Sequence, residues 1–150
     1  MSHRPTPPAP LKPAGLSHPC EVQVPLRPND FDWAGHLNNS VYPQLLETGR
    51  WEWGLAHGAD LRHSPLVAVV LRLQLDYLRT VEWDPVGRLV VRTSLADRSP
   101  YSFTLAQDVA EPGGTPVARG LVRLGLVDRH TKRVHRADLE SLLGPTGTVA

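Results

Sequence analysis

The sequence predicts an α+β fold in which a single long helix covers one face of an antiparallel sheet of about five strands. Residues 39–57 carry apolar side chains at helical spacing. The segments before and after this stretch alternate apolar and polar residues, as half-buried strands do. In addition, Pro112-Gly113-Gly114 forms a hairpin turn between two of the expected strands, which makes them antiparallel neighbours.

The first strand is expected at residues 20–27, where apolar and polar side chains alternate. Pro25 has no N–H to donate to a strand ladder, so this strand lies at a sheet edge or carries a bulge near that residue. Cys20, the one cysteine, is expected to be a buried strand residue rather than a catalytic thiol, since free cysteine mostly behaves as a small hydrophobe.

The helix at residues 39–57 has Asn38 or Asn39 as its capping residue, and Pro43 fits its first turn. Gly58 follows its last residue as a helix terminator. Trp51 lies off the core stripe, where it lines a pocket or a subunit contact. The side chains expected to pack against the sheet are Tyr42, Leu45, Leu46, Gly49, Trp53 and Ala56.

Four further strands are expected at residues 67–75, 88–95, 101–109 and 118–126, each with alternating apolar residues. In the first of these, Val67, Val69, Leu71, Leu73 and Leu75 are expected to share one face. A short helix at residues 137–143 closes the domain.

Composition indicates one domain of 150 residues with a net charge of +1, which argues against a nucleic-acid-binding surface. A single cysteine fits a reducing, cytoplasmic compartment. No apolar run reaches the length of a membrane span. We expect a disordered proline-rich tail at residues 1–19, the domain at 20–143 and a frayed tail at 144–150.

The segment from Asp30 to Tyr42 places carboxylates and an imidazole in a turn that leads into the helix. A helix start offers unpaired backbone N–H groups and the positive end of a dipole. A carboxylate beside such donors suits attack on a carbonyl, because the carboxylate activates water or attacks directly while an amide stabilises the oxyanion.

This segment resembles the signature of hotdog-fold acyl thioesterases of the 4-hydroxybenzoyl-CoA thioesterase-like family, roughly D-x-D-x-x-G-H-x-N-N-x-x-Y with a Glu-x-x-Arg pair on the helix. The likeness covers about residues 20 to 140. It implies a hotdog fold, in which the sheet wraps the helix and two protomers pair edge to edge. The matching residues are Asp30-Phe31-Asp32, Gly35-His36, Asn38-Asn39, Tyr42, Glu47, Arg50 and the segment Leu75-Asp76-Tyr77-Leu78-Arg79.

By this resemblance Asp32 is the nucleophile or general base, and the backbone N–H of Asn39 faces the thioester oxygen. His36 orients the carboxylate, contacts substrate or simply bridges the turn. Glu47 either acts from the opposite protomer or forms an ordinary surface pair with Arg50, three residues further along the helix. Asp30 is expected to cap the turn.

We expect substrate contacts from Trp33, Asn38, Tyr42 and Trp51, whose aromatic members permit an aryl or a medium-chain acyl group. Arg79 and Arg98 are candidates for the phosphates of CoA or of a carrier-protein arm. No metal-binding or cofactor-binding motif is present in the sequence.

The leading hypothesis is hydrolysis of an acyl thioester of CoA or of an acyl carrier protein by a homodimer or homotetramer, with no nucleic-acid or membrane partner. A hotdog hydratase or dehydratase is a second possibility, but its D-x-x-x-x-H pattern is absent, because Phe31 stands five residues before His36. A non-catalytic acyl-binding domain is the third.

Overall fold

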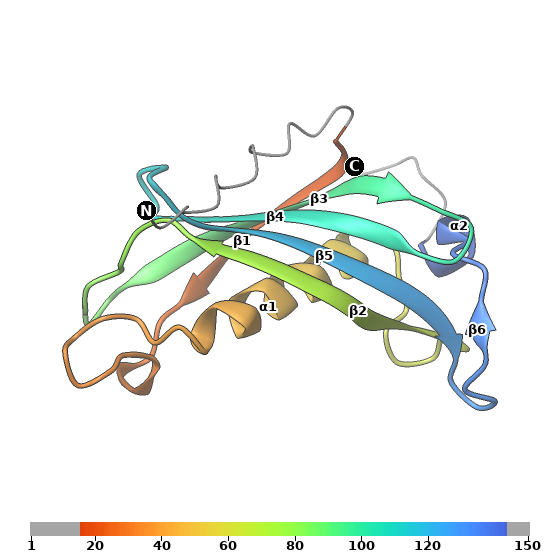
Figure 1. The fold of residues 1–150 in the computed structure, drawn as a ribbon, viewed down its shortest axis with the longest axis horizontal. Helices are drawn as coiled ribbons and strands as arrows, with labels where there is room; N and C mark the ends of the chain where they lie inside the picture. Colours follow the sequence, from red (N-terminus) through yellow and green to blue (C-terminus); the bar gives the residue numbers. More distant parts are fainter. Residues whose placement is uncertain (1–15, 144–150) are drawn as a thin grey trace, which may run out of the picture.

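The computed structural model describes residues 16–143, and in it the long helix lies across the concave face of an antiparallel sheet (Figure 1). The strand order is β1-β3-β4-β5-β2, with β6 paired to β5. This confirms the predicted α+β class and the hotdog arrangement. The elements are β1 (Ser17–Pro25), a 3-10 turn (Pro28–Asp30), α1 (Val41–Ala56), β2 (Leu66–Tyr77), β3 (Arg88–Arg98), β4 (Phe103–Ala110), β5 (Pro116–Asp128), β6 (Val134–His135) and α2 (Leu139–Leu142).

Strand β1 lies at an edge of the sheet, as Pro25 predicted. It begins at Ser17, three residues before the expected start, and its register shifts between Ser17 and Cys20 rather than near Pro25. The rest of the expected N-terminal tail, and residues 144–150, lie outside the described residues. Cys20 is half-buried, and burial together with the negative charge of Glu52 raises its pKa, as suits an unreactive thiol.

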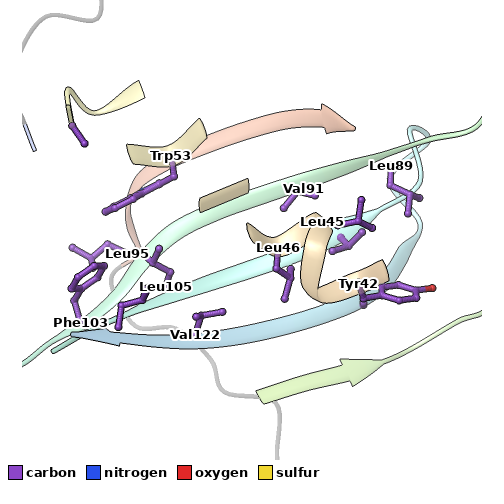
Figure 2. Packing of buried hydrophobic residues seen from close by; sticks show 14 of the residues in the cluster. Tyr42, Leu45, Leu46, Trp53, Leu89, Val91, Leu95, Phe103, Leu105 and Val122 are labelled. Carbon is purple, nitrogen blue, oxygen red and sulfur yellow. The ribbon is translucent and has the colours of Figure 1, made fainter. Parts of the chain in front are cut away.

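Helix α1 packs mainly against β1 and β3, and its apolar stripe is buried as expected (Figure 2). The exception is Ala56, the last residue of the helix, which is exposed. Trp53 stacks against Phe103 with ring centroids 6.3 Å apart, and its Nε1 donates to the His18 carbonyl at 2.7 Å. These contacts fix the C-terminal half of the helix.

Gly49 allows the middle of α1 to approach the sheet closely. A Cβ atom at this position would lie 2.5 Å from Cγ1 of Val91 and 3.0 Å from Nε2 of Gln107. No other residue type fits this contact without a shift of helix or strand.

Strand β2 forms the other edge, and its register shifts between Val70 and Arg72. The expected single apolar face is therefore wrong. Val70 lies opposite the buried Leu124 and Leu73 lies opposite the buried Val122, so Val70 and Leu73 share one face. The bulge at Leu71 moves the even-numbered residues before it to the same face as the odd-numbered residues after it.

The remaining elements follow the predicted pattern, but β3 and β5 extend beyond their expected ends, β4 begins two residues later than expected, and α2 is shorter than the expected helix. The turn at residues 111–115 joins β4 to β5, with Gly114 at a φ of 95°. Tyr101 lies outside β4 and is exposed. The described residues contain no helix that is both long and apolar enough to cross a membrane.

Candidate active site

The turn from Asp32 to His36 holds the Asp32 carboxylate in a fixed position. Its Oδ1 accepts hydrogen bonds from the backbone N–H groups of Ala34 (2.9 Å) and His36 (3.0 Å). Two backbone hydrogen bonds between Asp32 and its turn partners close the loop, and Gly35 sits at a φ of 79°, where glycine is favoured. Oδ2 accepts no hydrogen bond from the described residues, so this oxygen is available to a ligand.

The loop that follows β2 ties this turn to the sheet. Leu37 N–H donates to the Val81 carbonyl at 2.8 Å, and Trp83 N–H donates to the Gly35 carbonyl at 2.8 Å. His36 forms an isolated bridge with Glu82. The carboxylate of Asp32 is thus positioned by backbone on both sides, which suits a group that must meet substrate in one geometry.

Just before α1, the backbone N–H of Asn39 has no acceptor among the described residues. Ser40 is the N-cap residue, and neither Asn38 nor Asn39 caps the helix with its side chain. Instead, Oδ1 of Asn38 accepts hydrogen bonds from the N–H and Oγ of Ser40, both at 3.0 Å. Within residues 16–143, no acceptor pairs with the Asn39 N–H, while the Asn39 carbonyl accepts from the Tyr77 hydroxyl at 3.1 Å.

Asp30 has the structural role expected of it. Its carboxylate is buried and accepts from the Arg27 backbone N–H at 2.7 Å and from the Arg27 guanidinium at 2.9 Å. Burial alone raises the pKa of Asp30, but these hydrogen bonds and the charge of Arg27 outweigh it, so the pKa lies below its usual range. The pair braces the chain just before Asp32.

A small pocket of about 510 Å³ brings the turn and the helix start together. Tyr42 and Tyr77 form one wall, with their rings edge to face and centroids 5.1 Å apart. Burial, with a smaller contribution from Tyr77, raises the pKa of Tyr42, so its hydroxyl stays neutral. The lining residues are Asp32, His36, Leu37, Asn38, Asn39, Tyr42, Tyr77, Leu78, Arg79 and Thr80.

Six of the predicted site residues therefore meet in one pocket, which also contains Tyr77, an aromatic residue that was not among the predicted site residues. Tyr77 is the last residue of β2 and Thr80 lies in the loop that follows, both more than 35 residues after Asn39 in the chain. The resemblance included Tyr77 in its matching segment, but no spacing rule connected it to the helix start.

The other predicted site residues lie elsewhere. Glu47 and Trp51 line a larger cavity of about 870 Å³ beside the C-terminal half of α1. Trp33 points into solvent, with 99% of its surface exposed. Arg98 makes a two-pronged ion pair with Glu140, at 3.1 and 3.0 Å, and lines neither cavity.

The expected surface pair between Glu47 and Arg50 is not present among the ion pairs of the described chain. Arg50 turns inward and donates from Nη1 to Oε1 of the buried Gln107 at 3.2 Å. Arg50 pairs with Gln107 and not with Glu47, because an exposed ion pair contributes little free energy.

Chemically, the small pocket is lined by Asp32, whose Oδ2 accepts no hydrogen bond from the described residues, and by Asn39, whose backbone N–H has no acceptor among them. This combination can place a base or nucleophile and an oxyanion donor around a single carbonyl carbon. Among residues 16–143, no group of three or more side chains forms a metal site.

Comparison with known proteins gives a consistent family. Residues 26–142 match the model of the thioesterase-like superfamily. No significant match was found among curated protein sequences.

Solved structures share the fold. A proposed thioesterase from Pseudomonas aeruginosa has 27% sequence identity and a TM-score of 0.72, over 81% of this chain and 92% of its own. The YbaW protein of Escherichia coli, also a proposed thioesterase, has 25% identity and a TM-score of 0.69 over 82% and 98%. A 4-hydroxybenzoyl-CoA thioesterase, solved as an aspartate-to-asparagine mutant with 4-hydroxybenzoyl-CoA, has 17% identity and a TM-score of 0.71 over 84% and 99%.

Proposed function

The chain belongs to the thioesterase-like superfamily, and from that premise we propose that it hydrolyses an acyl thioester in the small pocket. Asp32 is the catalytic carboxylate, and the Asn39 N–H stabilises the oxyanion. The observation that carries this assignment is that Asp32, whose Oδ2 accepts no described hydrogen bond, and Asn39, whose N–H has no described acceptor, line the same pocket.

The reaction proceeds by one of two routes that the pocket accommodates equally. In the first, Asp32 removes a proton from water as the water oxygen bonds to the thioester carbon, the C–S bond breaks, and the proton passes to the departing thiolate. In the second, Asp32 attacks directly, expels the thiolate and forms an anhydride that water then cleaves. In both, negative charge grows on the carbonyl oxygen, where the Asn39 N–H donates.

The other pocket residues position the substrate. The neutral Tyr42 and the Tyr77 hydroxyl offer a polar edge to an otherwise aromatic wall. Arg79, for which the described residues supply no ion-pair partner, is placed to meet a phosphate of CoA or of a carrier-protein arm. Arg98 is withdrawn from this role, because Glu140 already occupies its guanidinium.

Glu47 is the alternative catalytic carboxylate, because it lines the larger cavity and is exposed there. A hydratase remains disfavoured by the Asp32–His36 spacing. Hydrolysis is tested by incubating the protein with a panel of aryl and straight-chain acyl-CoA esters and detecting free thiol. The proposal would be contradicted if no free thiol were released from any acyl-CoA of the panel and none from carrier-protein thioesters.

We further propose that the enzyme works in a reducing compartment, which keeps Cys20 a free thiol. We also propose that it is a dimer paired through β2. An exposed twelve-residue edge strand carrying Val70, Leu71 and Leu73 at 40% exposure or more needs cover. In an antiparallel β2–β2 pair, the Tyr77 end of one strand lies beside the Leu66 end of the other. The small pocket of one protomer then faces the larger cavity of its partner.

A further inference from the structure

The larger cavity, of about 870 Å³, has the size and walls of a small-molecule site. It exists because α1 packs toward β1 and β3 and leaves the β2 side of the concave face uncovered. Its inner wall is apolar and includes Phe103, Leu105, Leu124 and Leu142. Such a wall accepts a hydrocarbon chain or ring.

Only one charged side chain of this cavity reaches inward. Glu47, Asp60 and Arg62 also line it, but all three are exposed, whereas Arg50 is half-buried. Asp60 is already engaged by the N–H groups of Arg62 and His63. The charge that a bound molecule would meet beyond the entrance is therefore that of Arg50.

The sheet fixes the position of Arg50 through Gln107. Gln107 is fully buried, and both of its amide N–H groups are used, by the Leu46 carbonyl at 2.9 Å and by Oγ1 of Thr93 at 2.8 Å. Its Oε1 is then the atom left to accept from Arg50, at 3.2 Å. The close approach at Gly49 brings Gln107 within reach of the helix.

The guanidinium of Arg50 is under-satisfied. It has five N–H donors, yet the one hydrogen bond it makes within the described chain is to Gln107, and no described carboxylate lies within 4.0 Å of it. Burial lowers the pKa of Arg50, and the charge of Glu47 only partly offsets this. A half-buried cation with free donors is stabilised by an oxyanion, which can accept two parallel hydrogen bonds from it.

We propose that the larger cavity binds the acyl part of the substrate. Arg50, held by Gln107, then recognises a carboxylate at the far end of that acyl group. The preferred substrates are thus thioesters of dicarboxylic acids, with an apolar chain or ring between the two carboxyl groups. This inference rests on the proposed function, since it names the acyl class that the enzyme hydrolyses. It assigns Arg50 to specificity and leaves the attack on the thioester to the small pocket.

The test compares two pairs of ligands that differ only in the terminal group. Binding is measured by calorimetry with the non-hydrolysable thioethers S-(5-carboxypentyl)-CoA and S-hexyl-CoA, and turnover with adipoyl-CoA and hexanoyl-CoA. The wild type is compared with Arg50→Met, which removes the charge, with Arg50→Lys, which keeps it, and with Arg133→Gln. Arg133 is exposed, and its side chain pairs with no described residue, so it controls for loss of one positive charge.

We expect the wild type to bind the carboxylated thioether at least about tenfold more tightly, the scale of a hydrogen bond to a charged group. Arg50→Met should abolish this preference without weakening the hexyl ligand, Arg50→Lys should retain part of it, and Arg133→Gln should match the wild type. Equal binding of both thioethers by the wild type would overturn the proposal. So would equal weakening of both by Arg50→Met, or conversion of Arg50→Met to a monomer, which would identify a protomer contact.

The two readouts separate this inference from the proposed function. A preference for the carboxylated thioether without hydrolysis of any thioester supports the role of Arg50 and rejects thioesterase activity. Hydrolysis of adipoyl-CoA and hexanoyl-CoA at equal rates, unchanged in Arg50→Met, supports the activity and rejects the role of Arg50.

Discussion

The two cavities of this protein differ in how they are built. The small pocket is made largely by one turn and a helix start, and backbone hydrogen bonds hold its polar groups in place. The larger cavity is mainly apolar, is assembled from two helices, a loop and three strands, and contains one inward-facing charge. This difference fits the division of roles proposed above: rigid local backbone suits the making and breaking of bonds, whereas a wide apolar space suits recognition of an acyl group.

The strongest test of this division is Asp32→Asn. We expect it to lower turnover by at least about a hundredfold, the scale of a lost acid–base or nucleophilic group. Asparagine keeps a side-chain oxygen for the N–H groups of Ala34 and His36, so the turn and the thermal stability should be preserved. Hydrolysis of the best acyl-CoA and thermal unfolding are measured together.

Glu47→Gln is the matched change in the larger cavity and should leave most of the activity. His36→Ala should fall between the two. If Asp32→Asn hydrolysed substrate at the wild-type rate while Glu47→Gln was inactive, chemistry would belong to the larger cavity and the division proposed here would be reversed.

The dimer prediction joins the two cavities, and Leu73→Glu in β2 tests it. Each introduced glutamate would bring an unpaired charge into the apolar contact between the two β2 strands, where burying it is costly. We expect a monomer by light scattering at micromolar concentration and loss of most turnover, because each small pocket would lose its partner's cavity. Val134→Glu in β6, which is exposed and separated from β2 by β5, is the control. A fully active monomer would contradict the joint site.

Gly49→Ala tests whether the close packing of α1 on the sheet, beside the larger cavity, stabilises the protein. The added Cβ would lie 2.5 Å from Cγ1 of Val91, so α1 must shift and the network of Gln107 and Arg50 must loosen. We expect a loss of about 1–3 kcal/mol in the free energy of unfolding, as overpacking usually costs. Gly113→Ala, with open space around its Cβ, should change little in the same denaturant titration. Equal stability of the two variants would show that the helix is less tightly seated than the contact implies.

The same contrast explains what the sequence could predict. That Asp32, His36, Asn38, Asn39 and Tyr42 would lie together could be predicted because they are near neighbours in the chain, and their expected roles came from the resemblance to a family signature. The larger cavity was not, because Arg50 meets Gln107 across 57 positions. The Arg50 side chain turns inward because Gly49, which has no Cβ, lets the helix approach Gln107 closely. Helical spacing alone allowed an exposed pair with Glu47.

The fold itself followed from periodicity, with errors where backbone irregularities intervene. The bulge at Leu71 reversed the faces of half of β2, and nothing in an alternating apolar run marks such a shift. The helix began two residues later than expected, because Asn38 stabilises Ser40 instead of capping the helix directly.

The smallest expected effect concerns the ion pair between Arg27 and Asp30, which braces the chain before Asp32. Its contribution to stability should depend on pH. The pKa of Asp30 is depressed in the folded protein, so its ionised form adds stability above the unfolded value of about 4, and this contribution is lost as the pH falls through the folded value. Asp30→Asn should therefore cost about 1–2 kcal/mol at pH 7 and progressively less in acid, by thermal unfolding. Asp97→Asn, at an exposed residue whose side chain makes no ion pair in the described chain, should show no such difference. A cost for Asp30→Asn that persists undiminished in acid would mean that packing, not the ion pair with Arg27, supports the turn.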